Sequence, residues 1–215
     1  MSENMAPRIA RWPQGLIAGL SLVVGLASYR YLIPGAPGAA PPILANSFTH
    51  LGALTIHAGF AATALVMGPF QFLTRLRTTR PRLHRIMGMG YVVCCTLAGI
   101  AGLVLAFGAR TGPISTAGFG LLAIGWIYTT LKAVQAARSR RFSQHRRWMI
   151  RSFALTFAAV TLRVYLPVAF LSPFGYDAAY RAISFLCWVP NLIAAELYLR
   201  RKATRIQPIV TSRTA

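Results

Sequence analysis

The sequence predicts an all-α membrane protein, a polytopic helix bundle of about six transmembrane helices with both termini cytoplasmic. Three observations support this prediction. Hydrophobic residues make up 55% of the 215 residues, whereas Asp and Glu together number 3. Apolar segments of about 20 residues recur along the chain, and each can cross a hydrocarbon layer of about 30 Å. The 23 Lys and Arg residues gather in alternate connections between these segments.

The first expected helix covers residues 14–33 and follows a short cytoplasmic segment, 1–13. Its apolar core resembles a signal peptide, but the run continues to Ile33 and no small-residue cleavage site directly follows the core. We therefore expect this helix to be retained. The segment from Pro34 to Pro42 is rich in Gly and Pro, so it is expected to be a loop.

Five more helices complete a transmembrane domain at residues 14–199, and a basic tail covers 200–215. Turns are expected at Gly112-Pro113 and from Ser172 to Gly175, and Pro190 is expected to interrupt the last helix. Glycines recur within the segments and would allow helix backbones to approach closely. The expected helices are 48–73, 85–108, 114–136, 148–171 and 178–199.

The basic clusters set the expected orientation. They lie in the second and fourth connections and in the tail, while the other connections carry few charges, so the basic side should be cytoplasmic. This pattern indicates a multi-pass inner (plasma) membrane protein whose arginines attract anionic lipid headgroups. No nucleic-acid partner is expected, because the clusters cap apolar spans instead of covering a soluble surface.

Polar residues on the fifth expected helix share one face. At 100° per residue, His145, Ser152, Thr156 and Arg163 form a narrow stripe that should face the bundle interior or a wet cavity. Arg151 points elsewhere, near the cytoplasmic rim. Two interpretations of Arg163 stay open, since its side chain can serve the interior or extend to the outer membrane interface.

Other helices carry fewer polar residues. His50 and His57 are seven residues apart on the second helix, and Gln71 continues their face toward the cytoplasm. His57 lies deep in an apolar run and is therefore a candidate functional residue. Asn191 follows Pro190 in the last helix.

Near the end of the same helix, Glu196 is expected either to pair with Arg200 one turn later or to have a functional partner. The three cysteines lie in apolar stretches and are expected to be buried without disulfides.

His84 and His145 open the third and fifth helices at a similar depth, and Tyr91 shares the face of His84. Neutral imidazoles on facing helices are axial ligands of haem b in membrane cytochromes, so the pair is a candidate haem site whose propionates would meet the arginines. The alternative is that both histidines are hydrated interfacial residues. His50 and His57 are spaced too widely for metal chelation, so no metal site is expected, but they could hydrogen-bond a quinone.

Several segments together resemble a bacterial family of predicted membrane proteins named "domain of unknown function 2306". The resemblance covers residues 50–197 and implies a multi-pass membrane protein without an assigned activity. It also implies that His57, His84, His145, Arg151, Arg163 and Asn191 belong to the family pattern. The segments are Gly68-Pro69-Phe70-Gln71-Phe72, Pro81-Arg82-Leu83-His84-Arg85, His145-Arg146-Arg147-Trp148-Met149-Ile150-Arg151-Ser152, Thr161-Leu162-Arg163 and Trp188-Val189-Pro190-Asn191-Leu192.

Three functions stay open at this point. The first is a membrane redox protein with haem b and a quinone or membrane redox partner. The second is a carrier of small anionic solutes along the stripe of Ser152, Thr156 and Arg163. The third is a non-catalytic assembly or partner protein. The sequence has no nucleophile elbow, P-loop or metalloprotease motif, so catalytic residues stay unknown.

Overall fold

A computed structural model describes residues 12–33, 48–109 and 111–204, and every regular element in these ranges is helical. Within these ranges six helical spans are long and apolar enough to cross a membrane, which confirms the predicted all-α bundle of about six transmembrane helices. They are Gln14–Leu32, Leu51–Gln71, Pro81–Phe107, Pro113–Arg138, Phe142–Phe170 and Tyr176–Lys202. The predicted loop from Pro34 to Pro42 lies outside the described residues.

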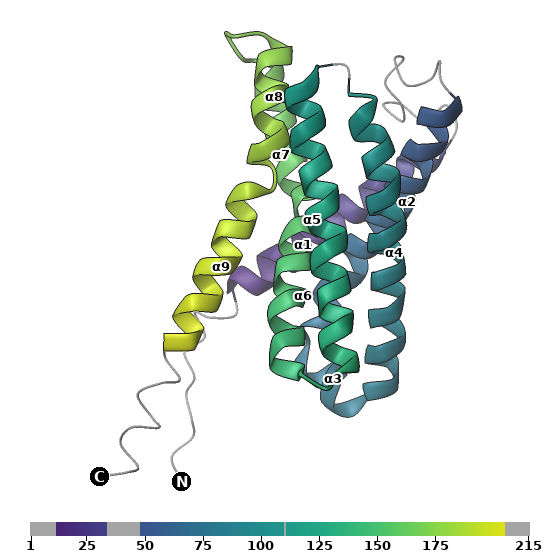
Figure 1. The fold of residues 1–215 in the computed structure, drawn as a ribbon, viewed down its shortest axis with the longest axis vertical. Coiled ribbons are helices and arrows are strands. Elements are labelled where there is room, and N and C mark those ends of the chain that lie inside the picture. The colour runs from purple at the N-terminus through teal and green to yellow at the C-terminus, as the bar shows by residue number, and fades with distance from the viewer. Residues whose placement is uncertain (1–11, 34–47, 110, 205–215) are drawn as a thin grey trace.

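The elements follow the predicted order with some subdivision (Figure 1). A 3-10 turn extends α1, and a short helix, α3, lies within the second connection. The last two spans each consist of two helices. The elements are α1 (Trp12–Ser28), η2 (Tyr29–Leu32), α2 (Phe48–Gln71), α3 (Thr74–Thr79), α4 (Pro81–Phe107), α5 (Pro113–Arg138), α6 (Phe142–Thr156), α7 (Ala158–Phe170), α8 (Tyr176–Leu186) and α9 (Val189–Thr204).

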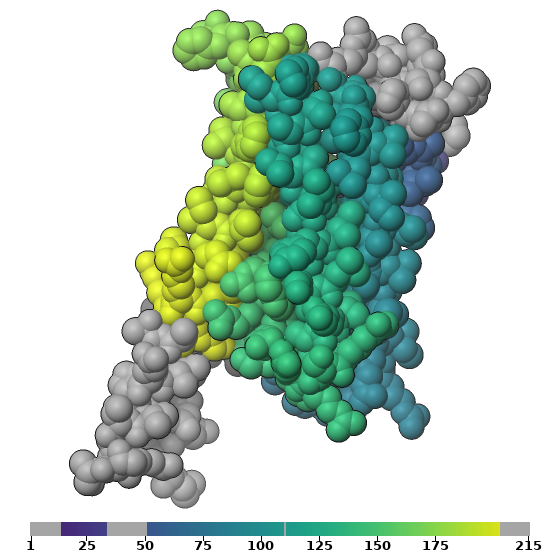
Figure 2. Space-filling view, viewed as in Figure 1, coloured from purple at the N-terminus to yellow at the C-terminus, as the bar shows by residue number. Residues whose placement is uncertain are grey.

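Four helices form the core of the bundle. Helix α2 packs on α4, α4 on α5, α5 on α6, and α6 returns to α2, so α4 and α6 face each other across a diagonal. Helix α1 crosses the bundle at a slant against α2 and α7 (Figure 1). Helix α9 lies along α6 on the side away from α4 (Figures 1 and 2). The two diagonal helices run in the same direction, because α5 lies between them in the chain and runs back.

The interior and the surface have the opposite composition from that of a soluble protein. Small or hydroxyl-bearing side chains dominate the buried positions, while large apolar side chains such as Val23, Ile86 and Phe107 are exposed. Small residues allow close packing of helices where lipid removes the usual hydrophobic driving force. The outer surface therefore suits contact with lipid.

Turns lie where the sequence predicts them. Gly112 and Gly175 immediately precede α5 and α8 with φ of 93° and 82°, values that side chains other than glycine rarely adopt. The last span breaks after Leu186 and resumes at Val189, next to Pro190, which has no N–H for the helical ladder.

The fifth span also breaks, at Phe157, where no proline or glycine predicts it. The Thr156 hydroxyl donates to the backbone carbonyl of Ser152 one turn earlier, at 3.0 Å. Back-bonding of this kind competes with the backbone ladder and bends helices.

One end of the bundle is strongly basic, and we call it the arginine-rich end. It contains α3, the start of α4 and the connection from α5 to α6, which lie low in Figure 1. Its arginines are Arg75, Arg77, Arg80, Arg82, Arg85, Arg138, Arg140, Arg141, Arg146 and Arg147.

Candidate functional site

A layer of hydrogen-bonded hydroxyl groups crosses the middle of the bundle. The Tyr91 hydroxyl on α4 lies 2.7 Å from Oγ1 of Thr156 and 3.0 Å from Oγ of Ser152, both on α6. From α5, Thr130 Oγ1 lies 2.8 Å from Ser152 Oγ, and the indole N–H of Trp126 donates to Thr156 at 2.9 Å. We call these five residues the hydroxyl layer.

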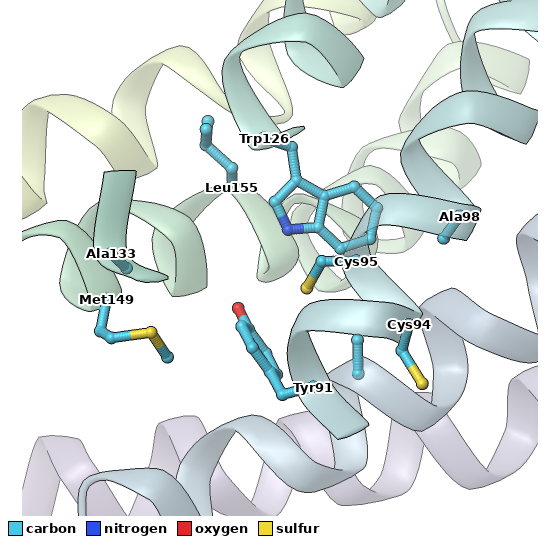
Figure 3. Packing of buried hydrophobic residues seen from close by; sticks show 9 residues of the cluster. Tyr91, Cys94, Cys95, Ala98, Trp126, Ala133, Met149 and Leu155 are labelled. Atoms are coloured by element: carbon cyan, nitrogen blue, oxygen red, sulfur yellow. The ribbon is translucent and has the colours of Figure 1, made fainter. Parts of the chain in front are cut away.

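Every donor of the hydroxyl layer has an acceptor. The hydroxyls form the chain Thr130–Ser152–Tyr91–Thr156, and each end also reaches a backbone carbonyl, that of Trp126 or of Ser152. Tyr91, Thr130 and Ser152 are completely buried, and Figure 3 shows Tyr91 and Trp126 around Cys95 at the centre of the core. The layer thus connects α4, α5 and α6 and fixes their positions along the bundle axis relative to one another.

His84 lies on the face of α4 that carries Tyr91, and His145 lies on the face of α6 that carries Ser152. Each precedes a member of the layer by seven residues, His84 before Tyr91 and His145 before Ser152. Seven residues make about two turns, or roughly 10 Å, and return to nearly the same face. Because the Tyr91 and Ser152 oxygens meet at 3.0 Å, the two histidines also face the same diagonal, toward the arginine-rich end. Their imidazoles are close enough to interact electrostatically.

The His145 ring is fixed by a backbone hydrogen bond. Its Nδ1 lies 2.9 Å from the carbonyl oxygen of Ala133 on α5. A carbonyl can only accept, so Nδ1 carries a proton, and the neutral form of the ring has its lone pair on Nε2. Metal-bound histidines usually have this arrangement.

Two buried nitrogens at the same end have no hydrogen-bond partner in the described part of the chain. They are Nδ1 of His84 and the side-chain amide Nε2 of Gln71. Gln71 ends α2 and is only 7% exposed. A methyl group placed on Gly88 would lie 3.3 Å from its Oε1, so the Gln71 amide packs where α4 has no side chain. Unpartnered buried polar groups are uncommon in proteins and call for an explanation.

The charge around these groups is positive. Arg77 and Arg85 both act electrostatically on His84, and His84 and His145 occupy the first turns of α4 and α6. Helix N-termini add to the positive potential. Among the described residues, no group of three or more His, Cys, Asp or Glu side chains could hold a metal ion. A haem iron, by contrast, takes two axial protein ligands.

His57 lies elsewhere in the interior. Its Nδ1–H donates to the carbonyl of Ala98 on α4 at 2.8 Å, and its ring packs against Gly102. The structure therefore gives His57 a helix-packing contact and does not bring it to the histidine pair. His50 belongs to α2, but its side chain lies outside the described residues.

Arg151 and Glu196 form an ion pair that the sequence does not predict. Arg151 on α6 donates to both carboxylate oxygens of Glu196 on α9, at 2.5 and 3.0 Å, and its guanidinium lies 4.7 Å from the ring centroid of Trp148. Arg200, the partner expected from the sequence, also acts electrostatically on Glu196. The pair attaches α9 to the bundle.

Arg163 departs from the predicted stripe, because the span breaks at Phe157. Its guanidinium donates to the hydroxyl of Ser28 on α1 and to the carbonyl of Ala159, each at 2.8 Å. Ser152 and Thr156 instead bond within the hydroxyl layer. These residues consequently do not form one continuous stripe.

Asn191 stabilises the break before α9. Its Nδ2 donates to Thr161 Oγ1 and to the carbonyl of Cys187, both at 3.1 Å, and the Thr161 hydroxyl donates to the same carbonyl. Asn191 therefore has a structural role where Pro190 interrupts the span.

Sequence reasoning missed Trp126 and Thr130. They are four residues apart and share one face of α5, and hydroxyl and indole groups in an apolar span are a usable signal. That signal is weak, because threonines in membrane helices commonly bond to their own backbone, as Thr129 does.

The fold and composition define a multi-pass membrane protein with a four-helix core. Residues 54–199 match the family model described as "Predicted membrane protein (DUF2306)", and the chain belongs to this family. No curated protein and no solved structure matches the chain. The family match therefore agrees with the resemblance inferred from the sequence, and the family carries no assigned activity.

Proposed function

We propose that this protein is a membrane redox protein that holds one haem b between His84 and His145. The observation that carries the proposal is that His84 on α4 and His145 on α6 face the same diagonal of the four-helix core. His84 and His145 lie about two turns from the hydrogen-bonded Tyr91 and Ser152, on parallel helices. Paired histidines on facing helices are the usual ligands of b-type haem in membranes.

The residues present fit such a group. His145 is held by Ala133 with its Nε2 free to coordinate. His84 would coordinate through its Nε2, which leaves the unpartnered Nδ1 available to a hydrogen-bond acceptor. The hydroxyl layer is fully buried, so a bound group would be confined to the arginine-rich end, where arginines can pair with carboxylates. When bound, haem would supply one-electron chemistry. The chain's own residues would orient the ligands and set the local potential.

The orientation and the partners are part of the same proposal. We infer that the arginine-rich end faces the cytoplasm of a bacterial cell, because arginine clusters of this kind are retained on the inner side. Anionic lipid headgroups would surround it, and electrons would come from a quinone or a membrane redox partner. Reporter fusions in the connections at 76–82 and 138–143 should both report cytoplasmic, and opposite results would contradict the orientation.

An absorption spectrum tests the haem. Protein purified from haem-replete cells should show a Soret band that shifts on reduction. His84→Ala and His145→Ala should each lower the haem content on the order of tenfold or more, since each removes one ligand. His57→Ala is the matched control, because the His57 ring is bonded to Ala98 and lies away from the pair. A colourless wild-type protein would overturn the proposal.

A further inference from the structure

The unpartnered nitrogens of Gln71 and His84 point to a binding site between the end of α2 and the start of α4. We propose that this site binds an anionic oxygen group, a carboxylate or a phosphate. Where the group is a haem propionate, the inference rests on the proposed function. Where it is a lipid phosphate, it does not.

The first step concerns the amide. Gln71 is more than nine-tenths buried, yet its Nε2, which can donate two hydrogen bonds, has no acceptor among the described residues. Burying such a donor without a partner is costly. The arrangement is explained if an acceptor from outside the chain lies against the amide.

The second step concerns position. The Gln71 amide packs over Gly88, and Gly88 lies four residues, about 6 Å, after His84 on the same face of α4. The second unpartnered nitrogen, Nδ1 of His84, is therefore about one helical turn from the amide. The absence of a side chain at residue 88 provides the space that the amide occupies. Two unpartnered nitrogens on adjacent helices thus lie about one helical turn apart.

The third step concerns charge. Arg77 and Arg85 act on His84, and the first turn of α4 contributes its helix N-terminus. Of the three carboxylates in the chain, Glu196 is paired with Arg151, and Asp177 begins α8 at the opposite end of the bundle. A positive potential combined with neutral donors favours an anionic oxygen group over a neutral carbonyl.

The decisive variants are Gln71→Leu, which removes the donor, and Gln71→Glu, which replaces it with a negative charge. Gln135→Leu is the matched control, because Gln135 is an exposed amide near the same end, on α5. One arm of the experiment measures haem binding by titration with hemin. The other arm measures phosphatidylglycerol retained by haem-free protein, by native mass spectrometry, with phosphatidylcholine as the comparison lipid.

We expect Gln71→Leu to weaken binding about tenfold in one arm of the experiment, and Gln71→Glu to weaken it at least as much. Binding to the Gln135→Leu variant should be unchanged. A loss confined to the hemin arm identifies a propionate, and a loss confined to phosphatidylglycerol identifies a lipid phosphate. Wild-type binding in both Gln71 variants overturns the site, as does intact binding in Gln71→Glu. If wild-type protein binds no hemin, the proposed haem function fails, but the lipid arm still decides this inference.

Discussion

The hydroxyl layer and the arginine-rich end lie on the same helix faces but differ in how their polar groups are satisfied. In the layer, every hydroxyl and the Trp126 indole have partners within the chain. Toward the arginine-rich end, about one turn away at Gln71 and two turns away at His84, buried nitrogens have none among the described residues. A saturated network fixes the packing of helices, while an unsatisfied one leaves bonding capacity for a ligand. The difference separates the part that holds the fold from the part that we propose as the site.

The largest expected effect is the removal of Tyr91 from the layer. Tyr91→Ala leaves a cavity at a completely buried position and removes the hydroxyl that bonds Ser152 and Thr156. We expect a loss of about 3–5 kcal/mol in the free energy of unfolding, measured in detergent micelles. Tyr128→Ala, at a 52% exposed position on α5, is the control and should cost far less. Equal losses in both variants would contradict the central role of the layer.

Adjacent threonines on α5 provide a finer comparison. Thr130 bonds Ser152 on α6, whereas Thr129, also buried, bonds only carbonyls of its own helix. Thr130→Val leaves the Ser152 hydroxyl with one partner fewer, so we expect it to cost about 1–2 kcal/mol. Thr129→Val should cost less than about 0.5 kcal/mol, because a helix carbonyl keeps its ladder bond. Thermal unfolding of the two variants side by side would decide whether the bond between helices matters.

The sequence predicts the layout of this molecule better than its contacts. Apolar length and arginine placement predict the six spans, and the matching positions of His84 and His145 at the starts of two spans predict their common depth. Periodicity does not predict the partner of Arg163, which lies beyond the break at Phe157 and bonds Ser28 on α1.

Partners on other helices were not predictable for a different physical reason. Arg151 and Glu196 are 45 residues apart, and only the packing of α9 on α6 brings them together. The Gln71 amide likewise lacks a partner only because of how α2 packs against Gly88. Local sequence contains neither fact, since both depend on which helices become neighbours.

A comparison of the half-buried amide of Asn191 with the buried amide of Gln71 tests whether Gln71 lacks a partner within the chain. Asn191 donates two hydrogen bonds, so Asn191→Leu should destabilise the protein by about 1–2 kcal/mol. The Nε2 of Gln71 donates none, so Gln71→Leu should be neutral or stabilise ligand-free protein by up to about 1 kcal/mol. The measurement is the unfolding midpoint without added hemin or lipid. A clear loss of stability in Gln71→Leu would show that the amide has a partner within the chain.

The smallest expected effect concerns the Arg151–Glu196 pair at the rim of the bundle. The two side chains are 17% and 35% exposed, so water and salt weaken their attraction. Glu196→Gln removes the charge and keeps the shape, and we expect a change of at most about 0.5 kcal/mol in the free energy of unfolding. The change should shrink further as salt is raised, because screening acts only on the charged pair. A large loss of stability that does not depend on salt would contradict this expectation. It would mean that the contact determines how α9 packs on α6, as the hydroxyl layer does for the core helices.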